Sequence, residues 1–186
     1  MTLPFHNPQP FKPQEVHMSI SPFDVGRTGL LDIDMRNDFV EGAPLESPEG
    51  RRLIPAVQKV PEAARVDGER GVEIHPSLAP RPGESVIKKR RFNSLRDLEI
   101  ILRGLGVETG FLTGMTTECC VLGAARGALE RGFRSEVISE GCVSCDCPDL
   151  GTGPRSAEEM NLPALRVMSL TSSQLADTHE SLARLP

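Results

Sequence analysis

The chain has 186 residues and a formal net charge of -5 at pH 7, which is enough material for one domain. An acidic protein of this kind is not expected to bind nucleic acid or anionic membranes, because both favour basic surfaces. The one basic run, residues 88–91, continues an apolar stretch, so we do not interpret it as a separate binding patch.

Neither a membrane span nor an export signal is expected from the sequence. No apolar run reaches about 18 residues, and the first residues lack the basic and apolar regions of a signal peptide. The five cysteines are an odd number and two of them are adjacent, which suits a reducing compartment better than a disulfide framework. We therefore expect a cytoplasmic protein.

The sequence of the first part of the chain predicts an extended arm followed by a domain. Residues 1–26 are rich in proline and lack hydrophobic periodicity, which indicates an extended arm before a domain of residues 27–186. Residues 27–34 predict a buried strand, although Asp32 within it would need a partner to be buried. Residues 51–66 have the spacing of a helix.

The rest of the chain alternates between strand and helix patterns. Strands are predicted at residues 85–89, 108–113, 134–139 and 164–170, and helices at residues 95–105, 118–131 and 172–182. This alternation predicts an α/β fold with three α-β-α layers and a mostly parallel sheet.

Three apolar runs end at reactive side chains, namely Asp34, Lys89 and, after a Gly/Thr turn, Cys120. Because the carboxyl ends of parallel strands share one edge of the sheet, where ligands bind, these three groups are expected to meet there. Each has an ordinary structural interpretation when taken alone: a strand cap, a solvated lysine and a small buried hydrophobe. Their joint occurrence in this order favours a catalytic site.

The three segments resemble the motifs of the isochorismatase-like cysteine hydrolases, which include isochorismatase, nicotinamidase and several N-carbamoyl and ureido amidohydrolases. The matching stretches are Ile33-Asp-Met-Arg-Asn-Asp-Phe39, Val86-Ile-Lys-Lys-Arg-Arg-Phe-Asn-Ser94 and Thr113-Gly-Met-Thr-Thr-Glu-Cys-Cys-Val121. The resemblance runs from about residue 28 to about residue 141. The sequence shows no counterpart of one strand between the first two motifs, so we expect a sheet one strand smaller than is usual in the family.

The resemblance implies a role for each motif residue. Cys120 would be the nucleophile, Lys89 would stabilise its thiolate, and Asp34 would accept the thiol proton and pass it to the leaving amine. Backbone N–H groups of Thr116 and Cys120 would form the oxyanion hole, with a cis peptide between Met115 and Thr116. Cys120 also falls in the first turn of a predicted helix, where the dipole should favour a thiolate.

Other residues near the motifs are candidates for substrate binding or rival roles. Phe39, Arg91 and Phe92 are predicted to bind substrate, and Arg91 resembles a position in the ureido and N-carbamoyl branch where a guanidinium would bind a carboxylate. Arg91 is equally well interpreted as a solvated charge. Cys119 is a rival nucleophile, and Asp38 is a rival base.

A second cysteine run, Cys142-Val-Ser-Cys-Asp-Cys147, has a spacing that can hold zinc or an iron-sulfur cluster, with His179 as a further ligand. The run follows a predicted strand, so a strand-to-helix loop with incidental thiols is the favoured interpretation. The four histidines are too scattered for the Asp/His/His metal site that the resemblance associates with nicotinamidases. We therefore expect neither a metal nor a cofactor.

The sequence thus predicts a cysteine hydrolase that cleaves a C–N bond of a small amide, ureido or N-carbamoyl compound through a thioester. Two alternatives stay open: an isochorismatase-type enol-ether hydrolase, and a non-catalytic family member that acts as a binding or assembly module. A sheet that lacks a strand would expose apolar surface, so a homo-oligomer, either dimer or tetramer, is expected. The other expected partner is a small-molecule substrate.

Overall fold

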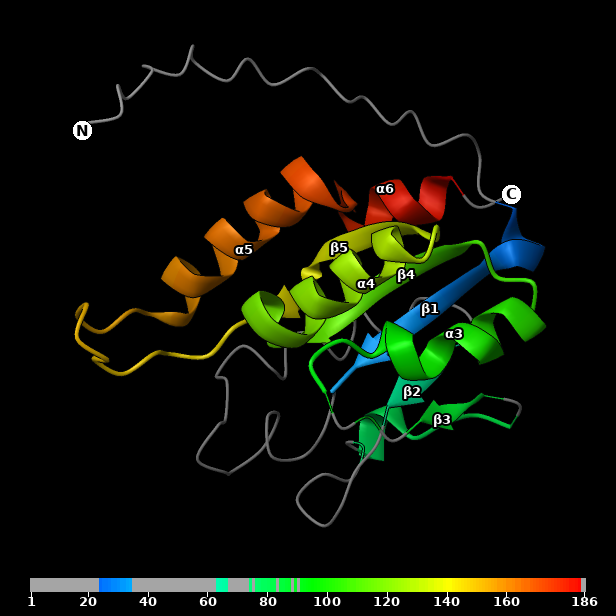
Figure 1. Cartoon of the computed structure of the whole chain (residues 1–186), viewed down its shortest axis with the longest axis horizontal. Helices are drawn as coiled ribbons and strands as arrows, with labels where there is room; N and C mark the ends of the chain where they lie inside the picture. The colour runs from blue at the N-terminus through cyan, green and yellow to red at the C-terminus, as the bar shows by residue number, and fades with distance from the viewer. Residues whose placement is uncertain are drawn as a thin grey trace, which may run out of the picture.

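The computed structural model describes residues 24–34, 63–66, 74, 76–82, 84–87, 89 and 91–184, with only the backbone of residues 63–66. Its strands are β1 (Thr28–Ile33), β2 (Ala63–Val66), β3 (Val86–Ile87), β4 (Thr109–Met115), β5 (Arg134–Val143) and β6 (Gln174–Ala176). They form one sheet in the order β3-β2-β1-β4-β5-β6, in which every neighbouring pair is parallel. The arrows of Figure 1 therefore point to a common carboxyl edge.

Helices cover both faces of this sheet. They are α3 (Leu95–Gly104), α4 (Leu122–Glu130), α5 (Ala157–Thr171) and α6 (Thr178–Ala183), with a π-helical turn, η3 (Thr117–Val121), before α4 and short 3-10 segments η1 (Val25–Arg27) and η2 (Pro76–Leu78). Side chains of α3, α4 and α5 share one buried cluster with Leu31 and Ile33 of β1 and Val137 of β5. Neighbouring side chains on a strand point to opposite faces, so Glu136 faces the other side, where α6 lies. The predicted three-layer α/β fold is confirmed.

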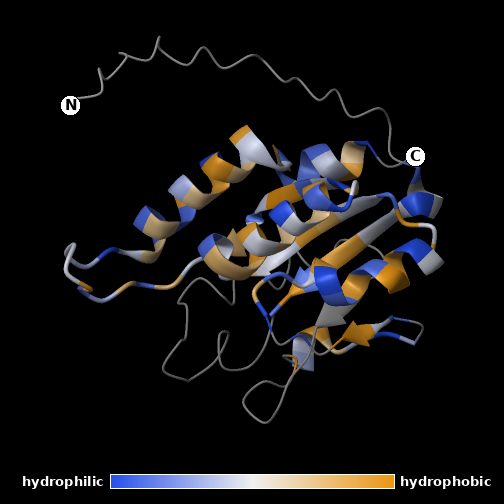
Figure 2. Cartoon of the chain, in the orientation of Figure 1, coloured by the Kyte–Doolittle hydropathy of each residue, from blue (hydrophilic) through white to orange (hydrophobic). Residues whose placement is uncertain are grey.

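The helices form where the sequence places an apolar stripe over the sheet. In α3 the buried leucines are Leu95, Leu98 and Leu102, which recur at the spacing of one helix face. Figure 2 shows hydrophobic and hydrophilic residues mixed along α3 and α5, as expected for helices with one face against a sheet. None of the helices in the described part of the chain combines the length and the hydrophobicity that a membrane span requires.

Three predictions of secondary structure are wrong in whole or in part. Residues 63–66 form β2 rather than the end of a helix, because they pair in parallel with both β1 and β3. The strand that we expected to be missing is therefore present, and the argument for an oligomer that relied on its absence no longer holds. Residues 1–23 and 51–62, which include most of the predicted arm and helix, lie outside the described residues.

The second error concerns residues 164–170, which belong to helix α5 rather than to a strand. Ser156 and Glu159 form a reciprocal capping box at the start of α5, and Ala164, Leu165 and Met168 are its buried residues. The predicted helix at residues 172–182 is divided between β6 and α6, and α6 starts with a second capping box between Asp177 and Glu180.

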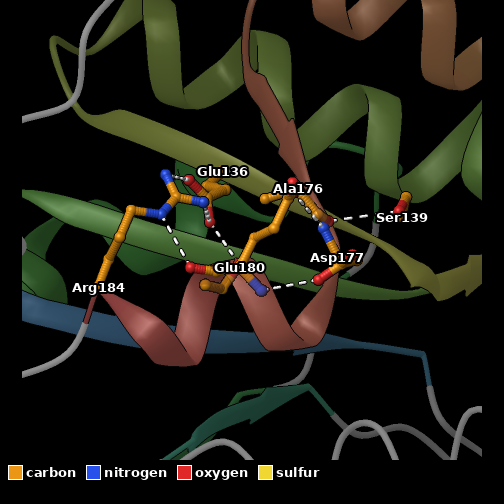
Figure 3. Close-up of polar contacts among 7 residues, drawn as sticks. Glu136, Ser139, Ala176, Asp177, Glu180 and Arg184 are labelled. Carbon is orange, nitrogen blue, oxygen red and sulfur yellow. Dashed lines mark hydrogen bonds and ion pairs between the residues drawn. The ribbon is translucent and has the colours of Figure 1, made fainter.

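Two buried carboxylates on the strands have partners. Asp32 on β1 is 2% exposed and accepts a hydrogen bond of 3.4 Å from Oγ1 of Thr113 on β4. Glu136 on β5 has a fully buried side chain, and Arg184 donates to its two carboxylate oxygens at 2.9 and 3.1 Å. Ser181 Oγ donates to the same carboxylate at 2.5 Å. Figure 3 shows Arg184, the residue directly after α6, reaching Glu136, so this bidentate pair ties the end of the helix to the sheet.

We expect Arg184→Met to lower the free energy of unfolding by about 3 kcal/mol near neutral pH, because it leaves a buried charge without its partner. Burial raises the pKa of Glu136 above its usual value, against the opposing effects of Ser181 and Arg184. A group with a raised pKa in the folded state contributes stability at low pH, and that stability is lost as the pH rises through the folded pKa. Loss of Arg184 raises the pKa of Glu136 further. Urea unfolding should therefore show that the variant loses more stability, relative to the parent protein, near pH 7 than near pH 5.

The matched control is the double variant Glu136→Gln with Arg184→Met, which has no charge left in the pair. Its stability relative to Glu136→Gln alone should not change over the same pH range. A deficit of Arg184→Met that is the same at both pH values would contradict this account of the pair.

Candidate active site

The three reactive residues predicted from the motifs follow three different strands. Asp34 comes directly after β1, Lys89 lies two residues beyond β3, and Cys120 lies in η3, which follows β4 after Thr116. Because these strands are parallel, their ends meet at one edge of the sheet.

At this edge the structure brings Asp34, Lys89 and Cys120 into contact. Lys89 Nζ lies 2.5 Å from Asp34 Oδ2 and 3.1 Å from Cys120 Sγ. The side chains of Lys89 and Asp34 are 10% and 6% exposed, and Cys120 is 8% exposed. One ammonium group therefore contacts both a carboxylate and a thiol in a largely dehydrated setting, where charge interactions are stronger than in water.

The backbone at the ends of β1 and β4 has unusual conformations. Asp34 has a φ of 55°, in the left-handed region that residues other than glycine rarely adopt and that is found preferentially at functional sites. The peptide between Met115 and Thr116 is cis, as the family resemblance implied.

Gly114 explains how these two strand ends can lie so close together. Its φ is 119°, and a Cβ at this position would lie 1.9 Å from the carbonyl oxygen of Ile33. Only glycine fits this approach, because any side chain would collide with the backbone that carries Asp34. The Thr-Gly pair in the third motif was the sequence signal for this position.

The surroundings raise the pKa of both Lys89 and Cys120. Burial lowers the pKa of Lys89, but Asp34 and Cys120 together raise it above the usual value of 10.5. Burial and the neighbouring Asp34 carboxylate raise the pKa of Cys120 to about 12, against the opposing effect of Lys89. Lys89 acts on this pKa in the expected direction, toward the thiolate, but burial and Asp34 act more strongly. The effect of the helix start on the thiol stays a prediction. Because both pKa values are raised, neutral pH favours the ammonium form of Lys89 and the neutral thiol of Cys120.

The backbone around Cys120 is arranged about one carbonyl group. The N–H groups of Cys119, Cys120 and Val121 donate to the carbonyl oxygen of Thr116, at 3.2, 3.0 and 3.3 Å. A substrate oxygen that binds the Cys120 N–H would have to compete with this carbonyl. The oxyanion hole formed by the Thr116 and Cys120 N–H groups stays a prediction.

The other candidate residues differ in their exposure to solvent, and two of them lie outside the described residues. Arg91 is exposed and Phe92 is 67% exposed, so both side chains are accessible to a ligand. Cys119 is exposed, in contrast to its buried neighbour Cys120, which favours Cys120 as the residue that works with Lys89. Phe39 and the rival base Asp38 lie outside the described residues.

One contact beside Cys120 was not predicted. Ser144, just after β5, donates a hydrogen bond of 2.5 Å to Glu118 Oε2 in the turn that contains Cys120. The contact ties this turn to the end of the neighbouring strand. Sequence alone offered no signal for it, because the two residues lie 26 positions apart.

The three cysteines of the second run differ in their burial and in the elements that carry them. Cys142 is buried in β5 and its thiol donates to the carbonyl oxygen of Leu112, whereas Cys145 and Cys147 are half-buried in the loop that follows. His179 lies on α6. Within the part of the chain that the structure describes, no group of three or more His, Cys, Asp or Glu residues is placed to hold a metal ion.

We expect hydrolysis by the purified protein to be unaffected by chelators, because the groups of the candidate site supply a nucleophile and a proton acceptor without a metal. Elemental analysis should find no stoichiometric zinc or iron. About one equivalent of zinc that disappears when Cys142, Cys145 and Cys147 are replaced would contradict this expectation, because it would show a thiolate site.

Comparison with known proteins gives the family. The isochorismatase domain model matches residues 62–165. The isochorismatase family protein YddQ of Bacillus subtilis (strain 168) is 36% identical over 140 residues, which cover 63% of this chain and 78% of YddQ. N-carbamoylsarcosine amidase of Arthrobacter sp. is 26% identical over 154 residues, which cover 61% of this chain and 58% of the amidase.

The fold has a close counterpart among solved structures. A cysteine hydrolase from Pseudomonas syringae pv. phaseolicola 1448A aligns with a TM-score of 0.84 at 19% identity, covering 89% of this chain and 95% of that chain. The domain match spans more than half of the chain, and it includes Lys89 and Cys120. The chain therefore belongs to the isochorismatase family of hydrolases.

Proposed function

We propose that the protein is a cysteine amidohydrolase that cleaves a C–N bond of a small amide, ureido or N-carbamoyl compound. The observation that carries the proposal is the position of Lys89, whose ammonium contacts the Asp34 carboxylate at 2.5 Å and the Cys120 thiol at 3.1 Å. A nucleophile within reach of a proton acceptor and a fixed cation is the arrangement that acyl transfer requires.

The first half-reaction forms a thioester. Cys120 Sγ attacks the carbonyl carbon while its proton passes to the Asp34 carboxylate, and the carbonyl electron pair moves to the oxygen. When the tetrahedral intermediate collapses, the C–N bond breaks and Asp34 returns the proton to the departing nitrogen, which leaves as a neutral amine or ammonia.

The second half-reaction restores the enzyme. Water attacks the thioester carbon, Asp34 accepts a proton from it, and the C–S bond breaks to release the acid. The sulfur leaves as a thiolate beside Lys89 and recovers its proton from Asp34. The net change is the addition of one water molecule across the C–N bond, with no other reactant.

The role of Lys89 follows from the raised pKa of the thiol. Because the pKa of Cys120 is about 12, a thiolate forms only as the proton moves to Asp34. The ammonium at 3.1 Å stabilises the negative charge that develops on sulfur in that step, and it is already in place before the reaction begins.

Two further groups would set the orientation of the substrate. The N–H groups of Thr116 and Cys120 would bind the carbonyl oxygen, and the exposed Arg91 guanidinium would bind a substrate carboxylate through two hydrogen bonds. The similarity to N-carbamoylsarcosine amidase supports an N-carbamoyl compound that carries a carboxylate.

The test is a substrate panel of N-carbamoyl amino acids, ureido acids and simple primary amides, with ammonia release as the readout. We expect release from at least one N-carbamoyl acid, and slower release from the matching amide without a carboxylate. Hydrolysis of isochorismate with no release from the panel would favour the enol-ether alternative. A folded protein inactive on all of these compounds would favour a binding or assembly role.

A further inference from the structure

Helix α4 carries two glycines on the side that faces the Lys89 segment. A Cβ at Gly123 would lie 3.2 Å from the carbonyl carbon and oxygen of Phe92 and 3.3 Å from the backbone nitrogen of Asn93. A Cβ at Gly127 would lie 2.2 Å from Asn93 Oδ1 and 2.5 Å from its Nδ2. Real Cβ atoms do not approach other heavy atoms as closely as the second pair, so the Asn93 side chain occupies the space that a side chain at position 127 would need.

Asn93 is also held from the opposite direction. Its Oδ1 accepts a hydrogen bond of 3.0 Å from the N–H of Leu95, the first residue of α3. The amide group of Asn93 is therefore fixed between the start of α3 and the glycine face of α4. A side chain at position 127 would therefore press on the amide group that accepts the Leu95 hydrogen bond.

The same short segment carries the cation of the candidate site. Lys89 lies four residues before Asn93, and its Nζ contacts the thiol of Cys120, which lies in the turn that leads into α4. Gly123 and Gly127 follow Cys120 by roughly 5 and 10 Å along the helix axis at 1.5 Å per residue. The segment is thus anchored to the nucleophile-bearing helix at its glycine face and contacts the nucleophile with its lysine.

We propose that Gly123 and Gly127 are positioning residues for Lys89: the absence of side chains at these two positions lets the segment of residues 91–94 lie directly on α4, which sets the contact between Lys89 and Cys120. The effect on turnover rests on the proposed function, whereas the effect on the thiol does not. Alanine forms helices more readily than glycine, so replacing a helical glycine that has open space around it with alanine would stabilise the helix.

The experiment measures the rate at which iodoacetamide alkylates Cys120, read by peptide mass spectrometry in a Cys119→Ser background and repeated across pH. We expect Gly127→Ala to slow the reaction by about tenfold at a fixed pH, because displacement of Lys89 removes an interaction that favours the thiolate, and one pKa unit is a tenfold change in thiolate. Lys89→Met shows the alkylation rate when the ammonium beside Cys120 is removed altogether. Gly104→Ala is the control, since that glycine on α3 has open space around it and its variant should match the parent.

A rescue separates positioning from general damage to the helix. Asn93→Ala removes the amide that occupies the space at position 127, so adding Gly127→Ala to it should have little further effect. Adding Gly123→Ala to Asn93→Ala should still slow the reaction, because that glycine contacts backbone. If Gly127→Ala does not fold, Asn93→Gln takes its place, since a longer amide must also move away from Gly127.

Two results would overturn the proposal. The first is alkylation of Cys120 in folded Gly127→Ala, or in its substitute Asn93→Gln, at the parent rate and with the parent pH profile. The second is slower alkylation of Cys120 in Gly127→Ala that remains equally slow when Asn93→Ala is added. Both can be observed even if no amide in the substrate panel is hydrolysed, so failure of the proposed function would not be mistaken for failure of this inference.

Discussion

Replacing Cys120 with alanine is expected to reduce amide hydrolysis to the background rate. In the proposed mechanism the thiol supplies the nucleophile, and neither charged partner can replace it, because Lys89 is an ammonium and Asp34 is the proposed proton acceptor. When catalytic residues act as one unit, removing the nucleophile alone abolishes most of the rate enhancement. Steady-state ammonia release at saturating substrate measures the effect.

Cys119→Ala is the matched control for this variant. Cys119 is exposed and adjacent, so its replacement should leave the rate within about twofold of the parent, as for most surface substitutions. Circular dichroism and urea unfolding establish that both variants are folded. An active Cys120→Ala protein together with an inactive Cys119→Ala protein would show that the nucleophile has been assigned to the wrong cysteine.

The second large effect is expected from the two charged partners of the thiol. Asp34→Asn removes the proposed proton acceptor and Lys89→Met removes the cation, so each should lower kcat by about two to four orders of magnitude, the range of general acid-base contributions. Each change also leaves a buried partner unpaired, since both side chains are 10% exposed or less. Urea unfolding is therefore needed to separate lost chemistry from lost structure.

Two controls sharpen this prediction. Lys89→Arg keeps the charge but replaces a compact ammonium with a planar fork, so it should retain more activity than Lys89→Met without reaching the parent rate. The combination of Asp34→Asn with Cys120→Ala should be no slower than Cys120→Ala alone, because the two residues act in the same step. Near-normal turnover in folded Asp34→Asn or Lys89→Met would rule out the triad.

The pH dependence follows from the two raised pKa values. Both the ammonium of Lys89 and the thiol of Cys120 keep their protons well above neutral pH, because the pKa of Lys89 lies above 10.5 and that of Cys120 is about 12. We therefore expect kcat/KM to stay level from neutral pH to about pH 9 and to fall only at higher pH, as Lys89 loses its charge. A thiolate held at rest would instead give selective alkylation of Cys120 at low pH.

The location of the site could be predicted from the sequence, whereas its contacts could not. Asp34, Lys89 and Cys120 each follow an apolar run, and parallel strands bring their ends to one edge, so the meeting place follows from a local pattern and one general rule. The contacts depend on features without a local signature. These include the left-handed backbone at Asp34 and the packing of Asn93 against Gly127.

The errors in the sequence prediction have related causes. Residues 63–66 are a short stretch with no strong strand pattern, and they form β2 because two neighbouring strands supply backbone partners. Residues 164–170 lie in a helix whose start is indicated by the Ser-x-x-Glu capping box at residues 156–159, a signal that the strand prediction did not use. The raised pKa of the thiol could not be predicted, because sequence spacing reveals the cation but not the burial of Cys120 or its interaction with Asp34.

The measurement that tests the proposed mechanism most directly is mass spectrometry of the protein quenched in acid during turnover of an amide that it hydrolyses. We predict an adduct on the peptide that contains Cys120, with the mass of the substrate less that of the released amine, and no adduct and no turnover in Cys120→Ala. Continued hydrolysis of the same amide by Cys120→Ala, without an adduct on Cys120 in the parent protein, would contradict catalysis by this cysteine.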